Sequence, residues 1–304
     1  MINYPRDMIG YADKSPKFLW PNKSKLAVQF VLNYEEGAEN NILHGDKSSE
    51  TFLSEIIGAE SYLNARHMSM ESIYEYGSRA GVWRILKLFR DNNIPITIFA
   101  VSNALKYNLH FVDKALEDGH EFCSHGLKWI NYQNIPLELE REHIKESIKI
   151  HTEICGSRPL GWYTGRTSVN TRNLIVEEGG FLYDSDDYSD DLPFWSKVID
   201  KPHLIIPYTL DVNDMRFATY QGFNTPKDFY NYLKYTFDQL YKEGNKKPKM
   251  MSIGLHCRII GRPGRFHALE KFLKYILTFD NIWIAKRIDI ANFWRSKFPK
   301  SDSK

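Results

Sequence analysis

Two adjacent carboxylates and two histidines are the side chains of this sequence best suited to hydrolytic chemistry. Glu35 and Glu36 directly follow an apolar run of strand length, His125 follows a second such run, and His256 ends a third. If the two carboxylates converge, their mutual repulsion raises the pKa of one of them and supplies a base near neutrality. Histidine transfers protons in the same pH range. The set therefore predicts a site for general acid–base catalysis.

Each of these residues also has a structural interpretation. Neighbours in a regular strand point to opposite faces, so Glu35 and Glu36 reach one site only where the strand has ended or bulged. Taken alone, such a pair is typical of a solvated turn, and a single histidine is more often structural than catalytic. Three ionisable features at equivalent ends of separate strands favour a shared site.

Short apolar runs that alternate with helical patterns must position these side chains. The runs of strand length are residues 26–33, 95–101, 120–124, 160–164, 181–184, 204–208, 250–256 and 282–285. The helical patterns are 80–92, 104–118, 137–154, 170–178, 226–243, 267–278 and 288–297. Such alternation predicts parallel β-α units, and we expect a single distorted (β/α) barrel of about seven parallel strands. In such a barrel the chemistry lies at the carboxyl ends of the strands.

We expect one domain over residues 1–304, because no repeat or Pro/Ser-rich linker marks a boundary. An N-terminal extension (1–25) precedes the first strand, and a long insertion loop follows it at about 37–75. Loops of that length are usually functional or packed against a neighbour, so this one is a candidate lid or subunit contact. A plain surface excursion is the alternative.

The composition narrows the class of partner and the compartment. Lysine plus arginine total 40 against 38 acidic residues, so no charge bias points to nucleic acid or a membrane surface. A small-molecule substrate is the better expectation. The three cysteines are an odd number without CxxC spacing, which fits a reducing compartment. No stretch approaches the roughly 20 apolar residues of a membrane span, and the N-terminus lacks an export signal, so we expect a cytoplasmic protein.

Two further polar clusters stand near predicted strand ends. The acidic run that starts at Asp184 fails the EF-hand calcium pattern, because Tyr188 occupies the third ligand position. It is interpreted as a polar loop on the active face or a surface acid cluster. Arg258, Arg262 and Arg265 could bind an anion or a carbonyl group, or form a subunit interface.

Several segments of the chain together resemble the polysaccharide deacetylase (NodB-homology) family, and within it the metal-independent allantoinase branch of urate catabolism. They are residues 4–7, 33–37, 70–81, 124–129, 158–166, 183–186 and 254–258. The resemblance covers nearly the whole chain and implies the distorted barrel of that family.

The resemblance also assigns expected roles. Glutamates stand where the family has two aspartates, which implies Glu35 as the general base, and Glu36 falls on a metal-ligand position. The family's second motif carries two histidines that bind metal; here the first is His125, but the second position is Trp129. Catalytic zinc normally keeps three protein ligands, and only Glu36 and His125 remain. We therefore expect no metal cofactor; the alternative is zinc completed by His44, His67 or Glu71.

The same resemblance implies Arg166 at the arginine of the third motif and His256 as the acid that protonates the leaving group. We expect Glu36 and His125 to position water and substrate, and Arg166 to contact the carbonyl or oxyanion. Trp129, Glu71, Tyr163, Asp184 and Arg258 are the expected substrate-binding residues.

These assignments bear on the substrate. Bound zinc lowers the pKa of water from about 15.7 to about 7, whereas a positioned base contributes about 10²–10⁴ in rate and one oxyanion donor about 10²–10³. Without metal, the rate enhancement from a base and an oxyanion donor suits an activated ring carbonyl. The expected reaction is therefore ring opening of allantoin or a related hydantoin or ureide. The alternatives are N-deacetylation of an amino sugar or peptidoglycan fragment with a recruited metal, and a pseudoenzyme that only binds. The resemblance implies a homo-oligomer, a tetramer in the allantoinase branch.

Overall fold

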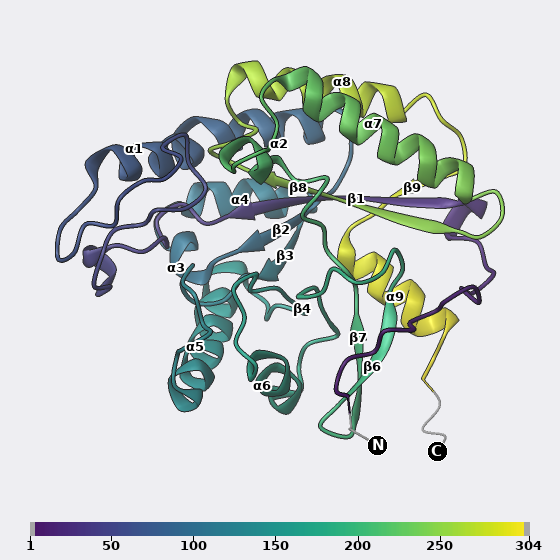
Figure 1. Ribbon diagram of the computed structural model, residues 1–304, viewed down its shortest axis with the longest axis horizontal. Helices are drawn as coiled ribbons and strands as arrows, with labels where there is room; N and C mark the ends of the chain where they lie inside the picture. Colours follow the sequence, from purple (N-terminus) through teal and green to yellow (C-terminus); the bar gives the residue numbers. More distant parts are fainter. Residues whose placement is uncertain (1–3, 301–304) are drawn as a thin grey trace.

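A computed structural model describes residues 4–300 and contains a nine-stranded sheet in the order β6-β7-β5-β4-β3-β2-β1-β8, with β9 paired to β1 (Figure 1). The strands are β1 (Leu26–Tyr34), β2 (Thr97–Ala100), β3 (Glu121–Ser124), β4 (Gly161–Trp162), β5 (Tyr183–Asp184), β6 (Phe194–Val198), β7 (Lys201–Ile205), β8 (Lys249–His256) and β9 (Ile282–Ile284). Every pairing is parallel except β6 with β7.

The centre of the sheet is β1, whose residues are all buried, as expected for a strand covered on both faces. It pairs with β8 over its whole length up to Asn33 opposite His256. On its other side β9 pairs with its first residues and β2 with its last. The sheet curls into a half-barrel, which confirms the α/β class and the distorted barrel, although it holds nine strands rather than about seven.

Helices cover the sheet on both sides. They are α1 (Met68–Tyr76), α2 (Val82–Asp91), α3 (Ser102–Leu105), α4 (Leu109–Glu117), α5 (Leu137–Cys155), α6 (Thr171–Glu178), α7 (Pro226–Glu243), α8 (Pro263–Ile276) and α9 (Arg287–Lys297). In Figure 1, α2, α7 and α8 lie together above β1 and β8, whereas α5 and α6 lie below, beside β3 and β4. Among the described residues every helix is too short or too polar to cross a membrane.

Most predicted elements are confirmed, and the differences have local causes. The helix expected over 226–243 is α7, which begins at Pro226 with a capping box between Thr225 and Asp228. The helix expected over 104–118 is split into α3 and α4, because the side chain of Asn108 caps a new helix. Strand β6 and helix α1 were not predicted.

Helix α1 lies inside the segment expected to be a loop. It continues through a π-helical turn (Gly77–Gly81) into α2. A side chain at Gly77 would collide with the Glu36 carboxylate, so glycine at that position permits close packing of the helix on Glu36. Residues 35–67 lie beyond the carboxyl end of β1 and extend to the left in Figure 1. The fold therefore places this long segment over the edge of the sheet where the candidate residues stand.

Candidate active site

The structure brings Glu35, His125 and His256 together. They lie at the carboxyl ends of β1, β3 and β8, which are close in the curled sheet. The Glu35 Oε1 atom is 3.3 Å from His125 Nε2 and 3.6 Å from His256 Nε2. All three side chains are buried. One carboxylate oxygen therefore faces two imidazole rings, an arrangement that can move protons between them.

A fully buried arginine links this trio to the second carboxylate. The Arg258 guanidinium donates from Nη2 to Glu35 Oε2 at 2.7 Å and from Nη1 to Glu36 Oε1 at 3.3 Å. Its Nε donates to the Leu53 carbonyl at 2.8 Å, and its Cζ lies 4.0 Å from the centre of the Tyr74 ring. The insertion after β1 therefore helps to fix the guanidinium that holds both carboxylates.

Glu36 is bound by different groups from Glu35. Its Oε2 atom accepts a hydrogen bond from the Glu35 backbone at 3.0 Å, which is possible because β1 ends at Tyr34. Its side chain borders a cavity of about 310 Å³ whose lining also includes Glu39, Asn41, Glu71, Ser78 and Tyr107. The two adjacent carboxylates thus share Arg258 as a side-chain partner, and of the two only Glu35 lies within 4 Å of the histidines.

Asp214 orients His256 and was not predicted. Its Oδ1 lies 2.6 Å from His256 Nδ1, and its Oδ2 accepts the backbone N–H groups of His256 at 2.7 Å and Ile260 at 3.1 Å. Asp214 begins a short 3-10 helix (Asp214–Ala218). A partial signal was available, because this aspartate lies in the polar segment that follows the expected strand 204–208, although not directly at its end. A carboxylate on Nδ1 leaves Nε2 directed at Glu35.

Burial and charge drive the pKa values of the two glutamates apart. Burial raises the pKa of Glu35, but the charges of Arg258 and His256 outweigh it and hold that pKa well below the ordinary value. Burial raises the pKa of Glu36 and is only partly offset by Arg258. Of the adjacent pair, Glu35 is therefore the carboxylate that stays ionised most firmly.

His256 is the candidate acid on the same argument. Burial lowers its pKa, but the negative charges of Asp214 and Glu35 raise it to about 9 overall. At neutral pH the ring is therefore an imidazolium whose Nε2 proton is directed at Glu35. This charge state suits a group that protonates a departing nitrogen.

Trp129 packs next to Arg258, and Arg166 packs against the same Trp129 ring. The Arg166 guanidinium lies 3.8 Å from the centre of the Trp129 ring, and its Nη1 is 3.7 Å from Glu50 Oε2. Trp129 is also 5.2 Å from the Arg258 guanidinium. Arg166 Nη2 is buried without a hydrogen-bond partner. The indole therefore separates the two arginines, and Arg166 does not contact Glu35.

The residues around this cluster do not fit a bound divalent metal. Among residues 4–300, no group of three or more His, Cys, Asp or Glu side chains is arranged to hold one. The possible replacement ligands are engaged elsewhere: His44 Nδ1 with the Glu39 carbonyl, His67 Nδ1 with the Met70 N–H, and Glu71 with Arg66. No step of the chemistry below is assigned to a metal.

The remaining expected substrate-binding residues differ in position. The Tyr163 ring packs against His125 with 5.0 Å between ring centres, so it borders the cluster. Asp184 instead pairs with Arg172 at 3.1 Å and His203 at 3.2 Å, apart from Glu35. Glu71 borders the cavity next to Glu36.

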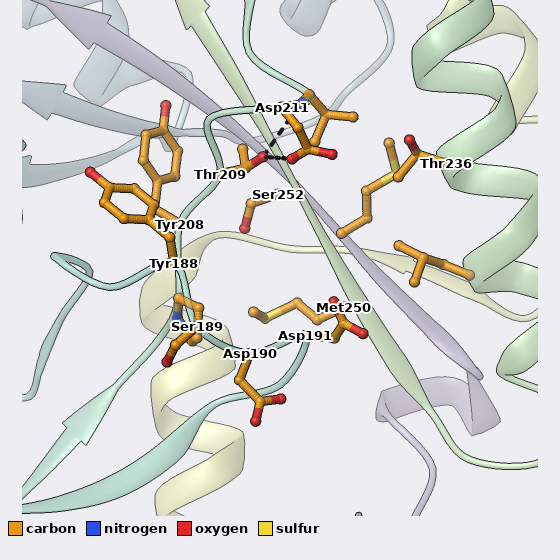
Figure 2. A pocket seen from close by; sticks show the side chains of 14 residues that line it. Tyr188, Ser189, Asp190, Asp191, Tyr208, Thr209, Asp211, Thr236, Met250 and Ser252 are labelled. Carbon is orange, nitrogen blue, oxygen red and sulfur yellow. Dashed lines mark hydrogen bonds between the residues drawn. The ribbon is translucent and has the colours of Figure 1, made fainter. Parts of the chain in front are cut away.

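A separate polar pocket of about 420 Å³ lies where β8 faces the chain that follows β7 (Figure 2). Ser252 and Met250 of β8 form one wall, and Thr209 and Asp211 form another, with a 2.7 Å hydrogen bond between the last two. None of Glu35, His125 or His256 lines this pocket. The candidate acid–base residues therefore lie outside this pocket.

Comparisons with known proteins find relatives that align with nearly the whole chain. Residues 64–179 match the family described as polysaccharide deacetylase. A Schizosaccharomyces pombe protein named "Putative polysaccharide deacetylase" is 45% identical over 317 residues, covering 97% of this chain and 98% of that protein.

Two solved structures are similar over nearly their whole length. The crystal structure of a probable polysaccharide deacetylase from Pseudomonas aeruginosa PAO1 has a TM-score of 0.96 and 57% identity, covering 98% of this chain and 100% of that chain. The crystal structure of PuuE allantoinase has a TM-score of 0.96 and 56% identity, covering 99% of this chain and 100% of that chain.

Proposed function

The chain belongs to the polysaccharide deacetylase family of carbon–nitrogen hydrolases, and on that premise we propose that it opens the ring of a small cyclic ureide such as allantoin. The observation that carries the proposal is the buried cluster of Glu35, His256 and Arg258, in which acid, base and cation are all supplied by the protein. The 56% identity to PuuE allantoinase supports the same substrate class.

In the proposed reaction Glu35 takes a proton from water as the water oxygen attacks the ring carbonyl. The carbon–nitrogen bond then breaks, and His256 donates the Nε2 proton to the departing nitrogen. The proton held by Glu35 returns to His256 across the 3.6 Å that separates their atoms. Both side chains recover their starting charges, and the products are a ureido nitrogen and a carboxylic acid, which releases its proton to solvent and becomes a carboxylate.

The ion pair between Glu35 and Arg258 limits which substrates can react. It keeps the carboxylate ionised, but its low pKa makes it a weaker base than an ordinary glutamate. A weak base needs a carbonyl that accepts water readily. The carbonyl of a hydantoin ring, flanked by an electron-withdrawing imide-like nitrogen, meets that need better than an unstrained N-acetyl group.

The depth of the cluster supports a small substrate. Glu35 is 1% exposed and His256 is 4% exposed. Residues of the insertion contact the neighbouring arginines: the Leu53 carbonyl accepts from Arg258, and Glu50 lies beside Arg166. A polymer chain would need an open groove across these residues, whereas a single ring can be enclosed.

N-deacetylation of an amino sugar or peptidoglycan fragment is the second candidate. The names of the S. pombe and P. aeruginosa relatives favour it. The two functions differ in product, because deacetylation releases acetate and ring opening does not.

A side-by-side assay separates these candidates. Purified protein is given allantoin, a cyclic imide and an N-acetylated oligosaccharide under the same conditions, and ring opening and acetate release are both measured. We expect ring opening of allantoin without acetate release from the oligosaccharide. Acetate release with no ring opening would refute the proposal, and no turnover of any substrate would favour a binding protein.

A further inference from the structure

The Arg258 guanidinium occupies the space between two buried carboxylates that a divalent cation would otherwise have to fill. We propose that Arg258 is a built-in replacement for a metal ion, and that removing its charge converts Glu35, Glu36 and His125 into a site that takes up a divalent cation. The inference deepens the proposed function, because it assigns the source of positive charge next to the candidate base.

The contacts of Arg258 are those of a counter-ion shared by two anions. Its two terminal nitrogens reach a different carboxylate each, at 2.7 Å to Glu35 and 3.3 Å to Glu36. A guanidinium fork can bridge two carboxylates in this way, whereas a lysine ammonium cannot hold the same planar geometry. The arginine side chain is 0% exposed, so water contributes little to balancing these charges.

The surroundings hold the guanidinium in one position. Its Nε donates to the Leu53 carbonyl, and its plane lies next to the rings of Tyr74 and Trp129. Trp129 takes the place at which the family motif has its second histidine. An apolar ring at that position removes a nitrogen ligand and supplies a surface against which a guanidinium can pack. The tryptophan and the arginine thus act as a pair.

The atoms left behind by Arg258 are suitable metal ligands. Glu35 and Glu36 would present carboxylate oxygens, and the His125 Nε2 atom already lies 3.3 Å from Glu35 Oε1. Oxygen and imidazole ligands of this kind bind zinc and similar first-row ions. Loss of the arginine also leaves two buried negative charges without a partner, which favours uptake of a cation.

The test measures metal binding directly and needs no substrate. The Arg258→Ala variant and the unchanged protein are treated with chelator, dialysed against Co²⁺, and assayed for metal content and for visible absorption of bound Co²⁺. We expect about one Co²⁺ per Arg258→Ala chain and none per unchanged chain. Co²⁺ should also raise the Tm of the variant alone. Absence of Co²⁺ from the variant would overturn the proposal.

Two controls make the result specific. The double variant Arg258→Ala with Glu36→Gln should lose most of the Co²⁺ bound by the single variant, because one ligand has lost its charge. Arg287→Ala removes another fully buried arginine, whose contacts are neutral oxygens, and should bind no Co²⁺. Co²⁺ uptake by Arg287→Ala would also count against the proposal.

A third variant covers the case in which Arg258→Ala does not fold. Arg258→Gln keeps most of the side-chain volume but not the charge, and it is measured in the same way. If neither variant binds Co²⁺ under conditions in which the unchanged protein is folded, the inference is wrong. If Co²⁺ binds but the unchanged protein does not open allantoin, the inference holds and the proposed substrate is wrong.

Discussion

Two arginines, each fully buried, have opposite surroundings. Arg258 lies at the carboxyl ends of the strands and contacts the carboxylates of Glu35 and Glu36. Arg287 begins α9 inside the curled sheet and contacts neutral oxygens. Its acceptors are Ser185 Oγ at 3.0 Å, Gln29 Oε1, Ser252 Oγ and the Pro207 carbonyl at 2.9 Å each, and the Ile206 carbonyl.

The different partners indicate different roles for the two arginines, one in the reaction and one in the stability of the fold. Burial lowers the pKa of both arginines; it leaves that of Arg287 below the ordinary value, whereas Tyr74 and the two glutamates raise that of Arg258. Arg287 joins β8 to the chain that follows β7, strands that lie at or next to opposite ends of the sheet. Arg258 instead balances charges that the reaction would use. Changes near Arg258 should therefore affect rate first, and changes near Arg287 should affect stability first.

The largest effect is expected at the candidate base. Glu35→Gln removes the proton acceptor and should lower kcat by about 10²–10⁴. The free energy of unfolding should also fall, because Arg258 and His256 lose a buried charged partner, but the fold should be retained because Glu36 still pairs with Arg258. Measurement of kcat on allantoin together with thermal unfolding checks both parts. A variant with unimpaired turnover would remove Glu35 from the proposed mechanism.

The complementary change is Arg287→Met. It leaves several buried oxygens without their donor, so the free energy of unfolding should fall by about 3 kcal/mol or more. Activity per folded molecule should be retained, since Arg287 does not contact Glu35, His125 or His256. Urea unfolding and kcat/KM of the folded fraction are the measurements. A loss of kcat/KM without a loss of stability would contradict the assignment of Arg287 to the stability of the fold.

A smaller effect on rate is expected from Asp214→Asn. The pKa of His256 is raised to about 9, so in the unchanged protein kcat should fall as pH rises through about 9. Without the Asp214 charge, this limb should move toward neutral pH, and kcat near pH 8 should drop by about tenfold, because only a small fraction of His256 would keep its proton there. A pH profile of kcat for both proteins tests the shift, and an unmoved limb would assign the acid elsewhere.

The same pKa shift sets a pH dependence of stability. The folded pKa of His256 lies above its ordinary value of 6.5, so its ion pairs stabilise the fold fully below that pH. The contribution is lost as pH rises through about 9. Asp214→Asn should therefore remove part of the stability difference between pH 6 and pH 9.

The smallest effect is expected from Ser185→Ala. The change removes one acceptor of the Arg287 guanidinium and leaves its Nε–H group unpaired. The free energy of unfolding should fall by about 1 kcal/mol, with kcat unchanged. A cost as large as that of Arg287→Met would show that this one contact, rather than the whole set, holds the arginine.

The sequence was sufficient for the strands that carry the site. Continuous apolar runs mark β1 and β8, a shorter run marks β3, and their parallel order brings the residues at their carboxyl ends to one edge. It was not sufficient for β6. Phe194–Val198 pairs on one side only, with β7, and its residues are mostly half-buried, so it lacks the apolar run of a central strand. Helix α1 was missed because its apolar pattern is weak.

The site was predictable only in part, because the sequence pattern shows where a strand ends but not where the side chains beyond it point. Strand ends predicted the convergence of Glu35, His125 and His256. The direction of a side chain beyond a strand end depends on the turn that follows, so the place of Arg258 between the two carboxylates could not be read from spacing. The same limit applies to Asp184, which was expected at the substrate and pairs instead with Arg172 and His203.

The most direct test of the account compares turnover with metal content. Protein treated exhaustively with chelator is assayed for ring opening of allantoin while bound metal per chain is measured on the same sample. If Arg258 supplies the positive charge of the site, turnover should persist when metal is far below one ion per chain. Turnover that falls in proportion to metal content and returns when the ion is restored would contradict it.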